Sequence, residues 1–182
     1  ITAHKINGPK GIGALYVRRR NPRVQLVAQI HGGGHERGMR SGTLATHQIV
    51  GLAKAIEIAQ ACQDSEQTYI LSLRQHLWEQ LQHIDCIYLN GHPTQRLAGN
   101  LNLSVGGVDG TALLLGLNTA IAVSSGAACS STKNSPSHVL IALGRSEELA
   151  YASIRFGIGR FNTADQIDVA AQHAICTIKP LR

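Results

Sequence analysis

The sequence predicts an α/β fold in which short strands alternate with helices. Stretches with apolar residues at helical spacing begin just after residues that cap helices well, namely Thr46, Asp109 and Thr163. Between them lie short runs, such as residues 101–105, in which apolar and polar side chains alternate as in a half-buried strand. The chain has 182 residues, 43% of them hydrophobic, so it can bury a sizeable core in one large or two small domains.

The first third of the chain combines glycine-rich turns with one long apolar helix. Glycine and proline favour the turns, Val and Tyr favour a strand, and apolar side chains recur at helical spacing from Ile49 to Ile56. Asp64 and Ser65 are expected to interrupt the helix. In order, we expect a turn at 8–11, a strand at 13–17, a loop at 29–42 and a helix from about 47.

The remainder alternates helices and strands more regularly. Its first helix has an apolar stripe that includes Leu77, Trp78 and Leu81, which we expect to be core residues. Strands are expected where β-branched and alternating residues follow turn signals. The expected elements are helices at 66–84, 109–117, 137–143 and 163–178, and strands at 86–89, 101–105, 120–123 and 151–157.

Charge and hydropathy exclude some classes of protein. The mean hydropathy is −0.02, and no run of about 18 apolar residues could span a bilayer, so the protein is not membrane-integral. The net charge of +6 includes a cluster at Arg18, Arg19, Arg20 and Arg23. No aromatic series for base stacking accompanies it, so we expect a solvated edge or a docking patch for an acidic protein, and no nucleic acid.

Cysteine and histidine spacing argues against a metal site. The 4 cysteines show no CxxC spacing, which indicates reduced thiols in a cytoplasmic compartment. His31 and His35 flank three glycines, but this pair lacks a third ligand and a fixed geometry.

Lys5 is the first candidate for covalent chemistry. A lysine that bonds to a carbonyl cofactor needs rigid backbone, with hydroxyl and imidazole groups nearby to bind a phosphate. Thr2 and His4 supply those groups. On spacing alone, however, a lysine near glycines is more often a solvated surface charge.

Cys129 is the second candidate. It follows Gly126 and two alanines and precedes residues 130–136, a polar stretch that packs poorly, so a mobile loop is expected. Mobility suits a nucleophile that collects a group at one place and delivers it at another. Lys133 or His138 could raise its thiolate fraction. The alternative is a small buried hydrophobic residue.

Arg155 lies inside an apolar strand, where an unpaired guanidinium is costly. A planar carboxylate is its natural bidentate partner. That partner is either a ligand or an internal salt bridge with Glu147 or Glu148. Arg160 is expected to be structural.

Four segments in this order resemble the cysteine desulfurases of the NifS/IscS type, in the class V aminotransferase superfamily with PLP fold type I. They are 2–13, 31–43, the segment around Cys129, and 153–161. The resemblance covers essentially the whole chain, as the C-terminal half of such an enzyme. It implies that residues 1–60 end the large domain that binds pyridoxal 5'-phosphate (PLP). Residues 61–182 would form the complete small C-terminal α/β domain with the catalytic cysteine loop.

The resemblance implies a cysteine desulfurase that converts L-cysteine to L-alanine and transfers sulfur as an enzyme persulfide for iron–sulfur cluster assembly. It makes Lys5 the lysine that holds PLP, with Thr2 and His4 as further cofactor-binding residues. It places Thr43 at the cofactor phosphate of the partner subunit, which implies a homodimer.

By the same resemblance, Cys129 attacks the substrate sulfur and Arg155 binds the substrate α-carboxylate. A sulfur-acceptor or iron–sulfur scaffold protein is the implied partner. Thr2 stands where the family usually has serine, which retains the hydroxyl group. The length of the loop at 130–136 favours the subgroup that serves iron–sulfur assembly.

Two alternatives remain open. Instead of a cysteine desulfurase, the chain could be a non-catalytic small-domain interaction module or part of another class V PLP aminotransferase. Because the front of the family's large domain is missing from the resemblance, we expect the chain alone to bind PLP weakly or not at all, and to be inactive or impaired.

Overall fold

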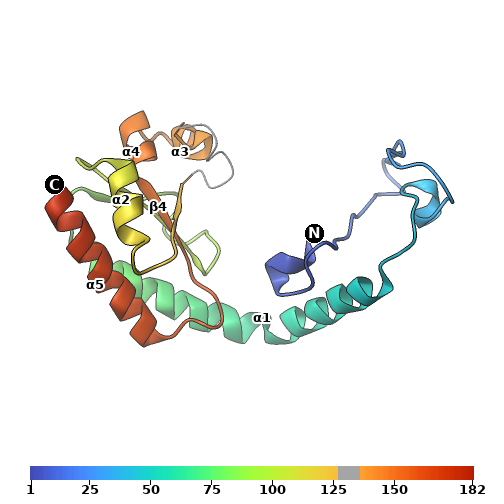
Figure 1. The fold of residues 1–182 in the computed structure, drawn as a ribbon, viewed down its shortest axis with the longest axis horizontal. Helices are drawn as coiled ribbons and strands as arrows, with labels where there is room; N and C mark the ends of the chain where they lie inside the picture. The colour runs from blue at the N-terminus through green and yellow to red at the C-terminus, as the bar shows by residue number, and fades with distance from the viewer. Residues whose placement is uncertain (127–135) are drawn as a thin grey trace. The chain divides into compact units, whose positions relative to one another are not determined.

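The computed structural model describes residues 1–126 and 136–182. The chain divides into two compact units, the first unit (Ile1–Gln63) and the second unit (Asp64–Arg182). Helix α1 (Thr46–Leu81) begins in the first unit and ends in the second (Figure 1). Within the described residues, no helix has both the length and the apolar character needed to cross a membrane.

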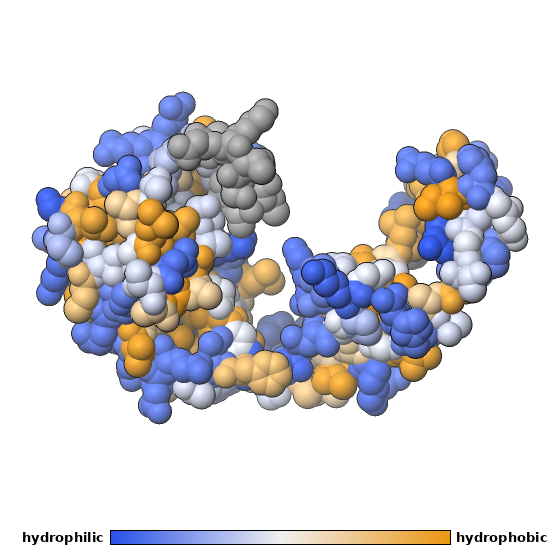
Figure 2. Space-filling view, viewed as in Figure 1, coloured by the Kyte–Doolittle hydropathy of each residue, from blue (hydrophilic) through white to orange (hydrophobic). Residues whose placement is uncertain are grey.

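The first unit contains two short 3₁₀ helices, η1 (Ala3–Ile6) and η2 (Glu36–Gly38), besides the start of α1. The predicted strand at 13–17 is wrong beyond Gly13, which forms an isolated antiparallel bridge with Thr2. A strand needs a partner for its backbone groups. Ala14 exchanges backbone hydrogen bonds with Ile1, but residues 15–17 have no such partner among the described residues. Large apolar side chains are exposed between residues 15 and 30, among them Leu15, Tyr16, Val27 and Ile30. Figure 2 shows apolar residues at the surface of the first unit.

Helix α1 starts at Thr46, close to the expected position, but the expected interruption at Asp64 and Ser65 is wrong. Asp and Ser are only modestly unfavourable inside a helix, and neither removes a backbone donor as proline does. The hydroxyl of Thr68 donates to the carbonyl of Asp64 at 2.9 Å, one turn back along the unbroken helix.

The second unit is built on an antiparallel four-stranded sheet with the strand order β1-β2-β4-β3. One face of this sheet packs against α1, α2 (Gly110–Leu117) and α5 (Ala164–Leu181) (Figure 1). Buried leucines supply much of this core, including Leu77, Leu81, Leu101, Leu103, Leu113 and Leu117. The strands are β1 (Ile87–Leu89), β2 (Asn100–Val105), β3 (Ser124–Ser125) and β4 (Ser153–Gly157).

Local capping signals predicted two helices correctly. Asp109 accepts a hydrogen bond from the backbone N–H of Ala112 at 2.7 Å and starts α2. Thr163 and Gln166 form a reciprocal capping box at the start of α5. Mixed α and β structure is therefore confirmed for this part of the chain.

Two expectations near the cysteine segment need correction. The strand expected at 120–123 is absent, and pairing begins instead at Ser124. Helix α3 (His138–Ala142) matches the expected helix, but α4 (Glu147–Tyr151) was not expected. A helix of five residues shows the helical period only weakly, and α4 was missed although its cap, Ser146, accepts from the N–H of Leu149 at 3.3 Å.

Candidate functional site

The turn that carries Lys5 is held at both ends by backbone hydrogen bonds. The N–H of Ala3 donates to the carbonyl of Ile12 at 3.0 Å, and the N–H of Gly8 donates to the carbonyl of Ala3 at 2.9 Å. Ala3 is completely buried, whereas Lys5 is exposed. The backbone of η1 is therefore fixed while its lysine amine stays accessible.

The same turn rests on the first part of α1. The side-chain amide of Gln48 donates to the carbonyl of Lys10 at 3.1 Å. Pro9 lies over Gly51, where a Cβ would approach Cγ of Pro9 to 2.4 Å. A Cβ on Gly8 would likewise lie 3.1 Å from Cβ of Ala55. Close packing on the helix thus adds to the rigidity that a covalent cofactor site requires.

Thr2 and His4 lie beside the lysine in this turn. Oγ1 of Thr2 and Nδ1 of His4 are 3.0 Å apart, and both groups are on the exposed side. A hydroxyl and an imidazole are suitable donors to phosphate oxygens, and the lysine amine is suited to a carbonyl carbon. The donor set of this turn therefore fits an aldehyde that carries a phosphate, as PLP does.

Thr43 ends the glycine-rich loop and is exposed. The loop is held by contacts within itself: the N–H of Gly42 donates to Nδ1 of His35 at 3.3 Å, and the N–H of Gly34 donates to the hydroxyl of Ser41 at 3.2 Å. The described residues contain no group of three or more His, Cys, Asp or Glu that could hold a metal ion.

In the second unit, Arg155 lies on β4 and is exposed, while its neighbours Ile154 and Phe156 are buried at 2% and 6% exposure. Because side chains alternate along a strand, Arg155 faces away from the apolar core. Among the described residues, its guanidinium forms no ion pair, so the alternative salt bridge with Glu147 or Glu148 is absent there. As far as the described residues go, the guanidinium is available to an external carboxylate.

Arg160 has the structural role expected of it. Its Nη2 lies 3.0 Å from Oε2 of Glu66, and both side chains are partly buried. The ion pair ties the segment after β4 to α1. Nearby, the hydroxyl of Tyr69 donates to the carbonyl of Asn162 at 2.8 Å.

Cys129 lies outside the described residues. The strand that leads toward it is β3, in which Ser124 is the register partner of Arg155. The structure thus groups Thr2, His4 and Lys5 on one turn of the first unit. In the second unit it pairs Arg155 with the strand that precedes the cysteine segment.

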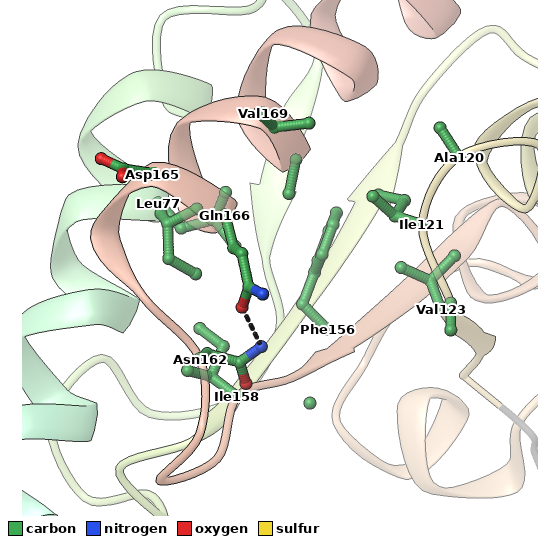
Figure 3. Close-up of a pocket in the computed structure, with 14 residues that line it drawn as sticks. Leu77, Ala120, Ile121, Val123, Phe156, Ile158, Asn162, Asp165, Gln166 and Val169 are labelled. Atoms are coloured by element: carbon green, nitrogen blue, oxygen red, sulfur yellow. Dashed lines mark hydrogen bonds between the residues drawn. The ribbon is translucent and has the colours of Figure 1, made fainter.

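A pocket of about 590 Å³ opens on the core side of the sheet in the second unit. Figure 3 shows the ring of Phe156 facing it between Gln166 and Ile121. Nδ2 of Asn162 donates to Oε1 of Gln166 at 3.2 Å on its rim (Figure 3). The lining is mostly apolar and comes from segments far apart in sequence, which is why sequence patterns did not indicate it. Arg155 is not part of it.

Sequence comparison identifies close relatives over the whole chain. The protein is 56% identical over 181 residues to "Cysteine desulfurase IscS" of Acinetobacter baumannii (strain AYE), a match to 100% of this chain and 44% of the relative. It is also 56% identical over 170 residues to the protein of the same name in Aeromonas salmonicida (strain A449), covering 93% of this chain and 42% of the relative.

Solved structures of NifS-like proteins are also similar to this chain. A "NIFS-LIKE PROTEIN" matches 99% of this chain and 45% of its own length, with a TM-score of 0.83 and 30% identity. The NifS-like protein from Rickettsia africae ESF-5 matches 86% of this chain and 41% of its own length, with a TM-score of 0.76 and 27% identity. The predicted fold class is thereby confirmed.

The chain spans somewhat less than half the length of the relatives it matches, at 44% of the first. The resemblance to NifS/IscS-type proteins is confirmed by these relatives. The family model for class V aminotransferases matches residues 1–169. The chain therefore belongs to the class V aminotransferase family.

Proposed function

We propose that this chain is the C-terminal part of a cysteine desulfurase that uses PLP and transfers sulfur for iron–sulfur cluster assembly. The observation that carries the proposal is the fixed turn that presents Lys5 beside Thr2 and His4. The names of the relatives reported above support it, because the identity extends over the whole chain. In this proposal residues 1–60 belong to the large domain and residues 61–182 form the small domain.

The residues of the first unit would hold the cofactor. Lys5 would bind it covalently through Nζ, while the hydroxyl of Thr2 and the imidazole of His4 would donate to its phosphate. Thr43 would bind the phosphate of the partner subunit's cofactor, so the active enzyme is a homodimer. When bound, PLP supplies an electron sink for carbanions at the substrate α-carbon. The amine of Lys5 would take and return protons at that carbon.

The residues of the second unit would act on L-cysteine. Arg155 would bind the α-carboxylate with two parallel hydrogen bonds. The thiolate of Cys129 would attack the substrate sulfur, so that an S–S bond forms and the substrate C–S bond breaks. The electron pair of the broken bond stays with the substrate β-carbon, which takes up a proton to give L-alanine. Sulfur remains on Cys129 as a persulfide.

The partners follow from this chemistry. The persulfide must pass to a sulfur acceptor or an iron–sulfur scaffold protein. The exposed basic cluster of Arg18, Arg19, Arg20 and Arg23 suits an acidic protein of this kind. Nothing in the proposal calls for nucleic acid or a membrane. The spacing of the cysteines supports a cytoplasmic location.

The test is to incubate the purified chain with L-cysteine and PLP, alone and with the N-terminal half of the Acinetobacter relative, and to measure alanine and protein persulfide. We expect alanine only when both halves are present, and a persulfide only on Cys129. In the variant Cys129→Ala, both products should be lost. Turnover that survives this change would indicate another class V aminotransferase, and no turnover in any mixture would favour a non-catalytic module.

A further inference from the structure

Four residues form a row across the sheet on the face that carries Arg155. Asn102 on β2 and Ser124 on β3 are the register partners of Arg155 on its two sides. The row continues to the edge of the sheet, where the backbone N–H of Asn90 donates to the carbonyl of Asn102 at 2.9 Å. Directly opposite residues share a face and have Cβ atoms about 4.5–5.5 Å apart. The side chains of Asn102 and Arg155 therefore start from neighbouring positions on one face of the sheet.

Asn90 is buried, at 4% exposure, and its side chain connects three groups. Its Nδ2 donates to Oδ1 of Asn102 at 2.7 Å and to the hydroxyl of Ser104 at 2.8 Å. Its Oδ1 accepts a hydrogen bond from Nε of Arg145 at 2.7 Å. Arg145 is itself held, because its Nη2 donates to the carbonyl of Leu89 at 2.7 Å.

Arg145 determines which way both amides point. A guanidinium can only donate, so the Asn90 atom facing it must be the oxygen. The nitrogen of Asn90 then faces Asn102, and the atom of Asn102 that meets it must be an oxygen. The nitrogen of Asn102 is left over, and it donates no hydrogen bond among the described residues.

Two donor groups from neighbouring positions therefore lack acceptors in the described part of the chain: Nδ2 of Asn102 and the guanidinium of Arg155. Ser124 lies on the other flank of Arg155, but no hydrogen bond of the described residues fixes the direction of its hydroxyl. Asn102 is half-buried and its orientation is set before any ligand arrives. Preset donors bind an anion without the cost of ordering them.

We propose that Asn102 is a second residue that binds the substrate α-carboxylate. Its Nδ2 donates to one carboxylate oxygen, and the guanidinium of Arg155 binds the carboxylate from the adjacent strand. Arg145 is a positioning residue that acts through Asn90. This inference rests on the proposed role of Arg155, and its ligand class is the carboxylate of a small amino acid.

The decisive variant is Asn102→Asp, which keeps the size of the side chain and still offers an oxygen to Nδ2 of Asn90. It removes the donor and sets a negative charge beside Arg155. Asn100→Asp is the matched control. Residue 100 lies two positions earlier on the same strand and face, is partly buried, and pairs with Gly157 rather than with Arg155.

The experiment is an NMR titration of the ¹⁵N-labelled chain with L-alanine, with L-alaninamide as a ligand that lacks the carboxylate. We expect L-alanine, but not L-alaninamide, to shift both the Nδ2 resonance of Asn102 and the Nε resonance of Arg155. Because a hydrogen bond to a charged group contributes about 1.5–3 kcal/mol, Asn102→Asp should weaken binding at least about tenfold. Asn100→Asp should change it less than about twofold.

Two variants of Arg145, with Asn102→Ser as a third, separate a positioning role from general damage to the fold. Arg145→Met should weaken L-alanine binding and move the Asn102 amide resonance, and Arg145→Lys should restore both in part because lysine still donates to Oδ1 of Asn90. The backbone spectrum of the second unit must stay unchanged in each variant. Asn102→Ser, which keeps a donor, should also retain part of the affinity.

The outcomes distinguish this inference from the proposed function. If Arg155→Leu abolishes binding while Asn102→Asp binds as tightly as the native chain, Asn102 has no role and the role of Arg155 stands. If L-alanine shifts neither resonance, the carboxylate site is absent and both are overturned.

Discussion

Pro9 lies directly against Gly51, so closely that a methyl group on Gly51 would reach to 2.4 Å from Cγ of Pro9. This contact attaches the turn that carries Lys5 to helix α1. In an isolated helix, alanine in place of glycine is favourable by about 1 kcal/mol. At position 51 we expect the same replacement to be unfavourable, because the added methyl group has no room beside Pro9.

We therefore predict that Gly51→Ala lowers the stability of the first unit by about 1–3 kcal/mol, as overpacking commonly does. This loss of stability can be measured by urea unfolding, monitored through the amide hydrogen exchange of residues in the turn. The double variant Pro9→Ala with Gly51→Ala should regain most of the loss. If Gly51→Ala alone stabilises the protein, the turn does not rest on the helix.

A second prediction concerns pH. Asp168 on α5 accepts hydrogen bonds from Gln80 at 2.8 Å and from His76 at 2.6 Å, both on α1. The hydrogen bond from Gln80, and next that from His76, lowers the pKa of Asp168. A carboxylate whose pKa is lower in the folded state stabilises the protein above its unfolded pKa of about 3.9 and loses that contribution as pH falls further.

The midpoint of thermal unfolding should thus be lower for Asp168→Asn than for the native chain at pH 6. The difference should shrink as the pH is lowered through about 4 and below. Glu79→Gln replaces an exposed residue on α1 and is the control. Its difference in unfolding midpoint from the native chain should not shrink over this pH range. If the unfolding midpoints of Asp168→Asn and the native chain differed by the same amount from pH 6 to pH 3, the hydrogen bonds of Asp168 to α1 would not stabilise the protein.

The third prediction tests the start of α5. Thr163 accepts a hydrogen bond from the N–H of Gln166 at 3.3 Å, and Oε1 of Gln166 accepts one from the N–H of Thr163 at 3.3 Å. Thr163→Ala should therefore cost about 1 kcal/mol of unfolding free energy, whereas Thr163→Asp should cost little because aspartate caps equally well. Urea unfolding measures both. Equal losses for the two variants would show that the cap does not stabilise α5.

The sequence predicted local features better than distant ones. Asp109 and Thr163 were recognised as helix caps because a cap and its helix are neighbours in the chain. The strand expected after Gly13 failed because strand residues also need a partner, which the sequence of the segment does not contain. The interruption expected at Asp64 failed because the tertiary packing of α1 outweighs weak local preferences.

In the candidate site too, residues that are close in sequence were predicted together, whereas contacts between distant segments were not. Thr2, His4 and Lys5 could be recognised together because they occupy one turn. Arg155 was recognised from its apolar surroundings, but its neighbours Asn102 and Asn90 were not, because cross-strand register cannot be read from one sequence. A buried asparagine whose amide is oriented by an arginine becomes visible only when three separate segments have been placed.

The most direct test of the account is whether Lys5 is the lysine that holds PLP. The purified chain is incubated with PLP, reduced with borohydride and digested, and the labelled lysines are identified by mass spectrometry. Even where binding is weak, Lys5 should be labelled several-fold faster than Lys10, Lys54 and Lys179, and Thr2→Val with His4→Ala should remove that preference by removing the phosphate donors. Labelling of Lys5 at no more than the rate of Lys10 would contradict the account.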